Sequence, residues 1–103
     1  MSYLTDVAAA IRREVDPALL PADDTDSLFT IYAVLALAKG TAVTTEDVHN
    51  AWAAWMSGRQ PDHPSIQPFA ALSPAVQRED IPFVEAIHRV AVTLAPHRGP
   101  QLG

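Results

Sequence analysis

The residues best suited to chemistry lie at the end of a stretch that carries both tryptophans. Arg59, His63 and Ser65 share one short segment, and His49 and Trp55 come just before it. A cation, an imidazole and a hydroxyl beside an indole ring can surround a flat ligand, because aromatic rings cover planar groups and attract cations. One interpretation of these five residues is a pocket for a nucleotide-like molecule.

The same residues also have ordinary structural roles. In that interpretation Trp55 packs partly on the core, Arg59 complements the C-terminal end of its helix, and His63 bonds a carbonyl of its own loop. His49 lies at the edge of an apolar stripe, where we expect a ring nitrogen to bond the loop around His63. We favour the structural roles, because tryptophans at helical spacing usually serve packing.

Signatures of catalysis and of metal binding are missing from the sequence. Its four histidines are His49, His63, His88 and His97. No two of them have the spacing that places two imidazoles on one helix face. There is no cysteine, no glycine-flanked serine, no phosphate-binding loop and no dinucleotide fingerprint. We therefore expect no enzyme activity, no catalytic residue, no cofactor and no bound metal.

Composition limits the kinds of partner. The chain has 103 residues and a formal net charge of −5, and its seven basic residues are scattered. Nucleic-acid binding depends on clustered Lys and Arg, so we expect none. The longest apolar run, residues 28–38, is about half the roughly 20 residues of a membrane span. The N-terminus does not resemble a signal peptide, so we expect a cytoplasmic protein without a membrane partner.

Residues 45–57 are predicted to form the helix that positions the tryptophans. Thr44 and Asp47 have the spacing of a capping box, which marks the start of this helix. Its apolar residues gather on one face, with Trp52 in the middle of the stripe. We therefore expect Trp52 to be the core residue least tolerant of change, and Trp55 to be only partly buried.

Three more helices are predicted from apolar periodicity and end signals. They cover residues 3–15, 26–39 and 81–95. The second is apolar on nearly every side and is followed by Gly40, so we expect it to be central and to stop there.

A proline-rich segment separates the tryptophan helix from the last helix. Residues 59–72 contain three prolines and are expected to form an ordered loop, followed by one short helical turn at Ser73 and Pro74. The sequence thus predicts an all-α compact bundle of four main helices, one short helical turn and a proline-rich loop. We expect one domain over residues 1–96 and a flexible tail over residues 97–103.

Two motifs in the second half of the chain resemble a known family. Residues 48–53 read Val-His-Asn-Ala-Trp-Ala, and residues 63–69 read His-Pro-Ser-Ile-Gln-Pro-Phe. They are similar to the His-x-x-Trp-Ala and His-Pro-x-Leu-x-Pro-Tyr motifs of the repeat domain named after the ryanodine receptor. The long loop that this family carries between its motifs is largely missing here. The resemblance implies a module that senses a nucleotide or another small ligand.

The whole chain also resembles small uncharacterised proteins of actinobacteria and their phages. Tyr-Ala-Val-Leu-Ala-Leu-Ala-Lys-Gly, Asp-Val-His-x-Ala-Trp and His-Pro-Ser recur in them, and all three occur here. This resemblance implies a cytoplasmic accessory protein, acting in the host cytoplasm if it is phage-encoded. Two hypotheses follow: a protein-interaction module with a bacterial protein partner, and the small-ligand sensor. The sequence leaves the oligomeric state open.

Overall fold

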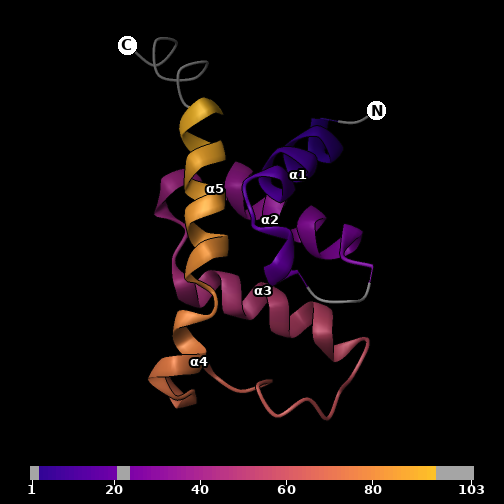
Figure 1. Ribbon diagram of the computed structural model, residues 1–103, viewed down its shortest axis with the longest axis vertical. Helices are drawn as coiled ribbons and strands as arrows, with labels where there is room; N and C mark the ends of the chain where they lie inside the picture. Colours follow the sequence, from indigo (N-terminus) through magenta and orange to yellow (C-terminus); the bar gives the residue numbers. More distant parts are fainter. Residues whose placement is uncertain (1–2, 21–23, 95–103) are drawn as a thin grey trace.

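The computed structural model describes residues 3–20 and 24–94, which form a bundle of helices (Figure 1). Within these ranges the α-helices are α1 Tyr3–Arg13, α2 Asp26–Lys39, α3 Thr45–Ser57, α4 Pro74–Arg78 and α5 Ile81–Leu94. Short 3₁₀ turns lie at Pro17–Leu19, Gly40–Ala42 and Phe69–Ala71, and the described residues form no strand. The all-α prediction of four main helices and one short turn is confirmed.

The predicted helix ends agree closely with the observed ones. The largest difference is at α1, which ends at Arg13 instead of residue 15. The predicted boundary between the domain and a flexible tail, at residues 96 and 97, lies outside the described residues. None of the helices in the described part is long and apolar enough to cross a membrane.

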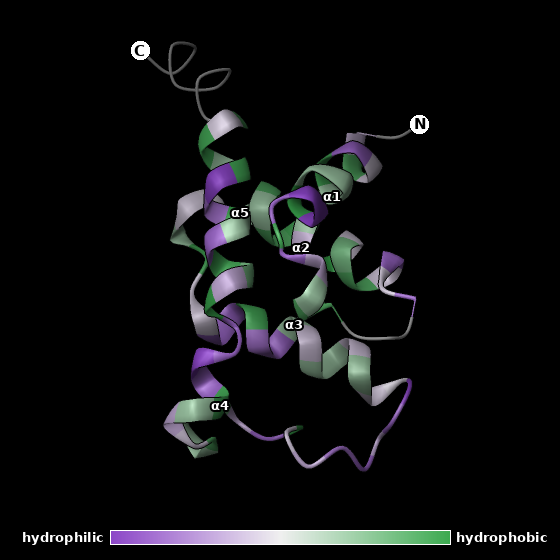
Figure 2. Ribbon diagram, in the orientation of Figure 1, coloured by the Kyte–Doolittle hydropathy of each residue, from purple (hydrophilic) through white to green (hydrophobic). Residues whose placement is uncertain are grey.

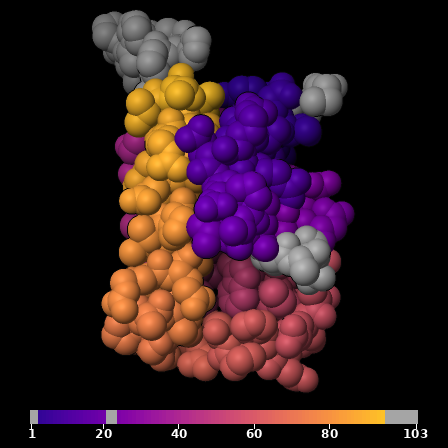
Figure 3. All heavy atoms as spheres, in the orientation of Figure 1, coloured from indigo at the N-terminus to yellow at the C-terminus, as the bar shows by residue number. Residues whose placement is uncertain are grey.

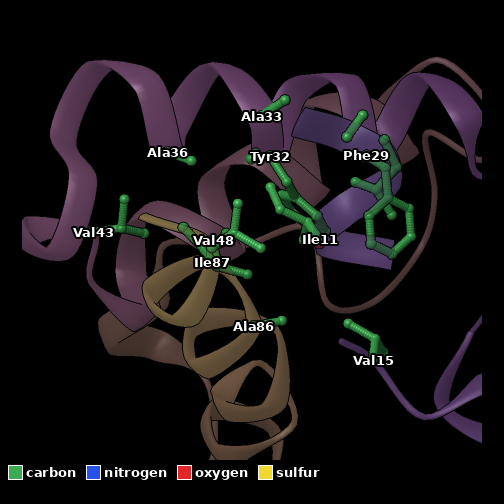
Figure 4. Packing of buried hydrophobic residues seen from close by; sticks show 14 of the residues in the cluster. Ile11, Val15, Phe29, Tyr32, Ala33, Ala36, Val43, Val48, Ala86 and Ile87 are labelled. Atoms are coloured by element: carbon green, nitrogen blue, oxygen red, sulfur yellow. The ribbon is translucent and has the colours of Figure 1, made fainter. Parts of the chain in front are cut away.

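Helix α2 is the centre of the core, as its composition predicts. It contacts α1, α3 and α5, and in Figure 4 its buried side chains face those of the neighbouring helices. Leu28, Phe29, Tyr32, Ala33 and Ala36 are its buried residues. The helix ends at Lys39 and is followed by Gly40, whose φ of 57° lies in a region that side-chain-bearing residues rarely adopt.

The capping box predicted at the start of α3 is present. Asp47 N–H donates to the Thr44 hydroxyl at 3.1 Å, and Thr44 N–H donates to Asp47 Oδ2 at 2.9 Å. Lys39, at the end of α2, donates to the same Asp47 oxygen at 2.9 Å. The bond from Lys39, followed by that from the Thr44 backbone, lowers the pKa of Asp47 below its usual value. These bonds fix the direction in which α3 leaves α2.

The two tryptophans of α3 exchange the roles predicted for them. Trp55 is 6% exposed and belongs to the core, whereas Trp52 is half-buried against it. The Trp55 indole N–H donates to the Ser27 hydroxyl at 3.0 Å, which anchors α3 to the first turn of α2. The prediction that Trp52 is a core residue and Trp55 only partly buried is wrong, because α2 packs on the side of α3 that carries Trp55.

The proline-rich loop after α3 folds back beneath the bundle, as predicted. Figure 2 shows that most of it is hydrophilic, while Ile66 packs against the core and Leu72 is buried. Gln77 of α4 donates to the carbonyls of Phe69 and Leu72, at 2.9 and 3.3 Å. The loop therefore returns to the bundle at defined points and forms a wall beside α3.

Candidate functional site

A cavity of about 470 Å³ lies where the proline-rich loop, α3 and the start of α5 meet. The 3₁₀ turn that contains Ala18 and Leu19 also lines it. In Figure 3 the surface is hollowed at this place. The lining residues come from helices α2 to α5 and from the segments that connect the helices: Ala18, Leu19, Leu28, Tyr32, His49, Trp52, His63, Ser65, Val76, Glu79, Asp80, Pro82 and Phe83. No Lys or Arg is among these lining residues, so the charge of the cavity is set by its carboxylates.

His49 joins the loop to α3 at one side of this cavity. Only 2% of this residue is exposed, and Nε2 lies 2.6 Å from the carbonyl oxygen of Gln67. Because a carbonyl only accepts, Nε2 must carry the hydrogen. The ring stacks on Trp52 with centroids 5.8 Å apart and planes at 30°. The predicted bond from His49 to the loop is confirmed, with Gln67 as the acceptor.

The second nitrogen of His49 faces the carboxylate of Asp80, which directly precedes α5. Nδ1 lies 3.8 Å from Asp80 Oδ2, too far for a hydrogen bond. Among the described residues no hydrogen bond reaches that carboxylate. Burial raises the pKa of Asp80 to about 6; the charge of His49 opposes this shift and that of Glu79 adds to it. A carboxylate with unmet hydrogen-bonding capacity thus lines the cavity.

Tyr32 of α2 brings a second polar group to the cavity. Only 1% of this residue is exposed, and its hydroxyl has no hydrogen-bond partner in the described part of the chain. Burial, and then the charge of Asp80, raise the pKa of Tyr32 above its usual value. Buried tyrosine hydroxyls usually find a partner, so this group is available to whatever enters the cavity.

His63 and Ser65 lie at the cavity, but their bond differs from the predicted one. His63 Nδ1 accepts a hydrogen bond from the Ser65 backbone N–H at 3.1 Å. The prediction that His63 bonds a loop carbonyl is therefore wrong, because the local turn offers an N–H instead. The His63 ring meets Trp52 edge-on, with centroids 5.0 Å apart. In the neutral ring Nε2 then carries the hydrogen and is a donor.

Trp55 and Arg59 form a separate cluster that does not line the cavity. The Arg59 guanidinium lies 4.4 Å from the centroid of the Trp55 ring. Its Nη2 donates to the Asp24 carbonyl at 3.2 Å and to the Ser27 hydroxyl at 3.4 Å. Arg59 thus crosses to the segment before α2 instead of complementing the end of its own helix. The proposed five-residue pocket is divided between two places.

Sequence reasoning missed the cavity residues that come from α2 and α5. Tyr32 lies within the predicted apolar helix over residues 26–39, and Asp80 lies directly before the predicted helix over residues 81–95. Glu79 and Phe83 were not considered at all as part of a site. The available signal was weak: Tyr32 is a residue with a polar tip in an otherwise apolar stretch.

Comparison with known proteins assigns a family. A model described as Domain of unknown function (DUF7701) matches residues 2–92. The chain belongs to the DUF7701 family. No curated protein and no solved structure matches the chain. The DUF7701 match covers both halves of the fold, and it carries no information on source organism, ligand or ryanodine-receptor repeats.

The contacts of the His49 ring bear on the chemistry that this DUF7701 domain can perform. The described residues include no group of three or more His, Asp or Glu placed to hold a metal ion. His49 has one nitrogen at the Gln67 carbonyl and the other toward Asp80. Neither nitrogen faces a hydroxyl nucleophile, whose activation needs a base within hydrogen-bonding reach. His49 therefore joins the loop to α3 and faces Asp80.

We expect Asp80→Asn to make the DUF7701 domain more stable at neutral pH. The carboxylate has a folded-state pKa of about 6 against an ordinary 3.8, so its ionisation opposes folding. Below pH 3.8 it is protonated in both states and costs nothing, whereas above pH 6 the whole cost is present. After allowance for solvent screening, we expect the free energy of unfolding of Asp80→Asn to exceed that of wild type by about 1 kcal/mol at neutral pH.

Urea denaturation at several pH values between 4 and 7.5 measures this effect. The difference in unfolding free energy between Asp80→Asn and wild type should grow as the pH rises through the interval from 3.8 to 6. Glu85→Gln, at an exposed site on α5, is the matched control and should show no such growth. A difference independent of pH would mean that desolvation of Asp80, beside His49, Glu79 and Tyr32, has no net cost.

Proposed function

We propose that this chain is a non-enzymatic protein-interaction module that receives a side chain of its partner in the cavity beside Trp52. The single observation that carries the proposal is the cavity itself, which places aromatic walls around polar groups with unmet hydrogen-bonding capacity. Interfaces concentrate their binding energy where an anchor side chain fills such a pocket. Leu19, at the cavity, is 49% exposed and adds apolar surface at the rim.

The proposed partner is a bacterial protein, met in the cytoplasm. The resemblance of the Asp-Val-His-Asn-Ala-Trp and His-Pro-Ser motifs to small actinobacterial and phage proteins supports this choice. If the gene belongs to a phage, the module is an accessory factor that acts on a host protein. Residues of both motifs, His49 and Trp52 from the first and His63 and Ser65 from the second, line the cavity.

The alternative proposal is a small-ligand sensor of the ryanodine-receptor repeat type. The cavity volume of about 470 Å³ is within the range of about 300–1,000 Å³ found for small-molecule sites, and the aromatic walls suit a flat base. The charges disfavour a nucleotide, because Glu79 and Asp80 repel phosphate. Arg59, the cation that the sequence offered for this task, is bound elsewhere.

Site-specific photo-crosslinking tests the interaction proposal. A photoreactive amino acid replaces Leu19 at the cavity rim or, as the matched control, Val92 on α5, which is 57% exposed and does not line the cavity. We expect the Leu19 probe to cross-link one protein in a bacterial lysate and the Val92 probe not to do so. Mass spectrometry identifies that protein, and its purified form should bind the wild-type chain.

Binding of the purified partner should weaken in Trp52→Ala, because the indole forms a wall of the cavity. Circular dichroism is used to check that this variant remains folded. Equal cross-linking from both probe positions would contradict the proposal. So would a purified partner whose affinity is the same for wild type and for Trp52→Ala.

A further inference from the structure

The charge of the cavity selects for cations. Asp80 and Glu79 line it, and none of its lining residues is Lys or Arg. A cation that enters therefore meets carboxylate charge without a competing positive side chain, apart from the two imidazoles. Charge complementarity of this kind directs binding and excludes partners of the wrong sign.

Two polar groups that line the cavity can accept hydrogen bonds for which the described residues supply no donor. The Asp80 carboxylate receives no hydrogen bond from the described residues, and the Tyr32 hydroxyl has no partner there. A hydroxyl oxygen can accept as well as donate. Only 1% of the Tyr32 residue is exposed, but its hydroxyl is not among the enclosed unpaired atoms of the described residues, so a group that enters the cavity can bond it. An occupant with several N–H donors on one rigid group answers both needs.

The walls of the cavity are aromatic. Trp52 and Phe83 line it, and the Phe83 ring lies 5.9 Å from that of Tyr32. The chain already holds one guanidinium against an indole, that of Arg59 over Trp55. Guanidinium groups stack on aromatic faces and are more weakly hydrated than ammonium groups, so they lose less on entering such a site.

We propose that the cavity binds the guanidinium group of an arginine side chain presented by the partner protein, with Asp80 and Tyr32 as its acceptors and Trp52 as its stacking wall. This inference rests on the proposed function, because it names the side chain that enters. An arginine carries five N–H donors in a planar fork, which matches a carboxylate and a hydroxyl on one side of a flat slot. Glu79 adds charge.

Nuclear magnetic resonance with small probes tests the inference without the partner. N-acetyl-argininamide is titrated into the labelled full chain at pH 7.5, and the indole N–H signals of Trp52 and Trp55 are followed. We expect a saturable shift of the Trp52 signal and none of the Trp55 signal. N-acetyl-lysinamide should bind more weakly, and adenosine monophosphate should give no shift.

Variants assign the contacts. Asp80→Asn should weaken argininamide binding by about tenfold, as expected for the loss of a charge-assisted bond. Tyr32→Phe removes only the hydroxyl and should weaken it about threefold. Glu85→Gln, an equal change of charge away from the cavity, should leave affinity unchanged. The spectrum of each variant tests whether that variant is folded. If Asp80→Asn is not folded, Glu79→Gln is used in its place.

The inference is overturned if argininamide gives no shift at Trp52, if Asp80→Asn, or Glu79→Gln in its place, binds it as wild type does, or if adenosine monophosphate shifts Trp52 instead. Its failure is separable from failure of the proposed function. If a protein cross-links through Leu19 but argininamide does not bind, the guanidinium inference is rejected and the interaction-module proposal stands. If argininamide binds but no protein cross-links to the chain, the cation site stands and the interaction-module proposal is rejected.

Discussion

Trp55→Ala is expected to lower the free energy of unfolding by about 3–5 kcal/mol. The indole is 6% exposed and packs within the core. Truncation removes this packing, the bond to the Ser27 hydroxyl and the ring beneath the Arg59 guanidinium. Small domains have about 5–15 kcal/mol in total, so the variant should be close to unfolding. Urea denaturation followed by far-ultraviolet circular dichroism measures the loss.

Trp52→Ala is the matched control, since it makes the same change one turn earlier in the same helix. Trp52 is half-buried, so its truncation should cost no more than about half as much. Trp55→Phe keeps most of the apolar area and should fall between wild type and Trp55→Ala. A Trp52→Ala variant that is more destabilised than Trp55→Ala would contradict the burial of Trp55 in the core.

His49→Ala is expected to have the next largest effect, a loss of about 2–4 kcal/mol. His49 is 2% exposed, and removal of its imidazole leaves a hole between Trp52 and Phe69, whose ring lies 6.0 Å from that of His49. The Gln67 carbonyl loses its donor at 2.6 Å. Among the described residues His49 is the positively chargeable group that faces Asp80, so its loss leaves a desolvated carboxylate without compensation.

Thermal melts of wild type and His49→Ala, with and without a panel of nucleotides, measure this prediction. His63→Ala is the control, because its bond to the Ser65 backbone lies within the loop, and it should melt closer to wild type. A His49→Ala variant that melts with wild type would show that the histidine does not hold the loop. A nucleotide that stabilises wild type but not His49→Ala would favour the sensor hypothesis.

Features of the fold that depend on neighbours along the chain were predictable. The capping box at Thr44 and Asp47 and the stop at Gly40 are local signals, and each is present in the structure. Apolar periodicity gave the helix ends to within two residues, and the all-round apolar character of α2 gave its central place. These features depend on hydrogen bonds and side-chain preferences among residues a few positions apart, so they can be identified from one sequence.

Features that depend on which helices meet were not predictable. Trp52 and Trp55 lie on one apolar stripe, and only the position of α2 decides which of them is enclosed. The site is non-local in the same sense. Tyr32 and Asp80 are far apart in the sequence, and each has an ordinary local role, in a core helix and before a helix. Their convergence on one cavity arises from the packing of three helices and a loop.

Pro61, Pro64 and Pro68 lie in the loop that forms one wall of the cavity. Each fixes one backbone angle and so narrows the freedom of the unfolded chain. The wall is also fastened to α3 through His49 and to α4 through Gln77. Such a wall is preorganised, so an entering group has little loop entropy to overcome. Discrimination among occupants then falls on the shape and charge of the group itself, because the cavity has little freedom to adapt to the wrong one.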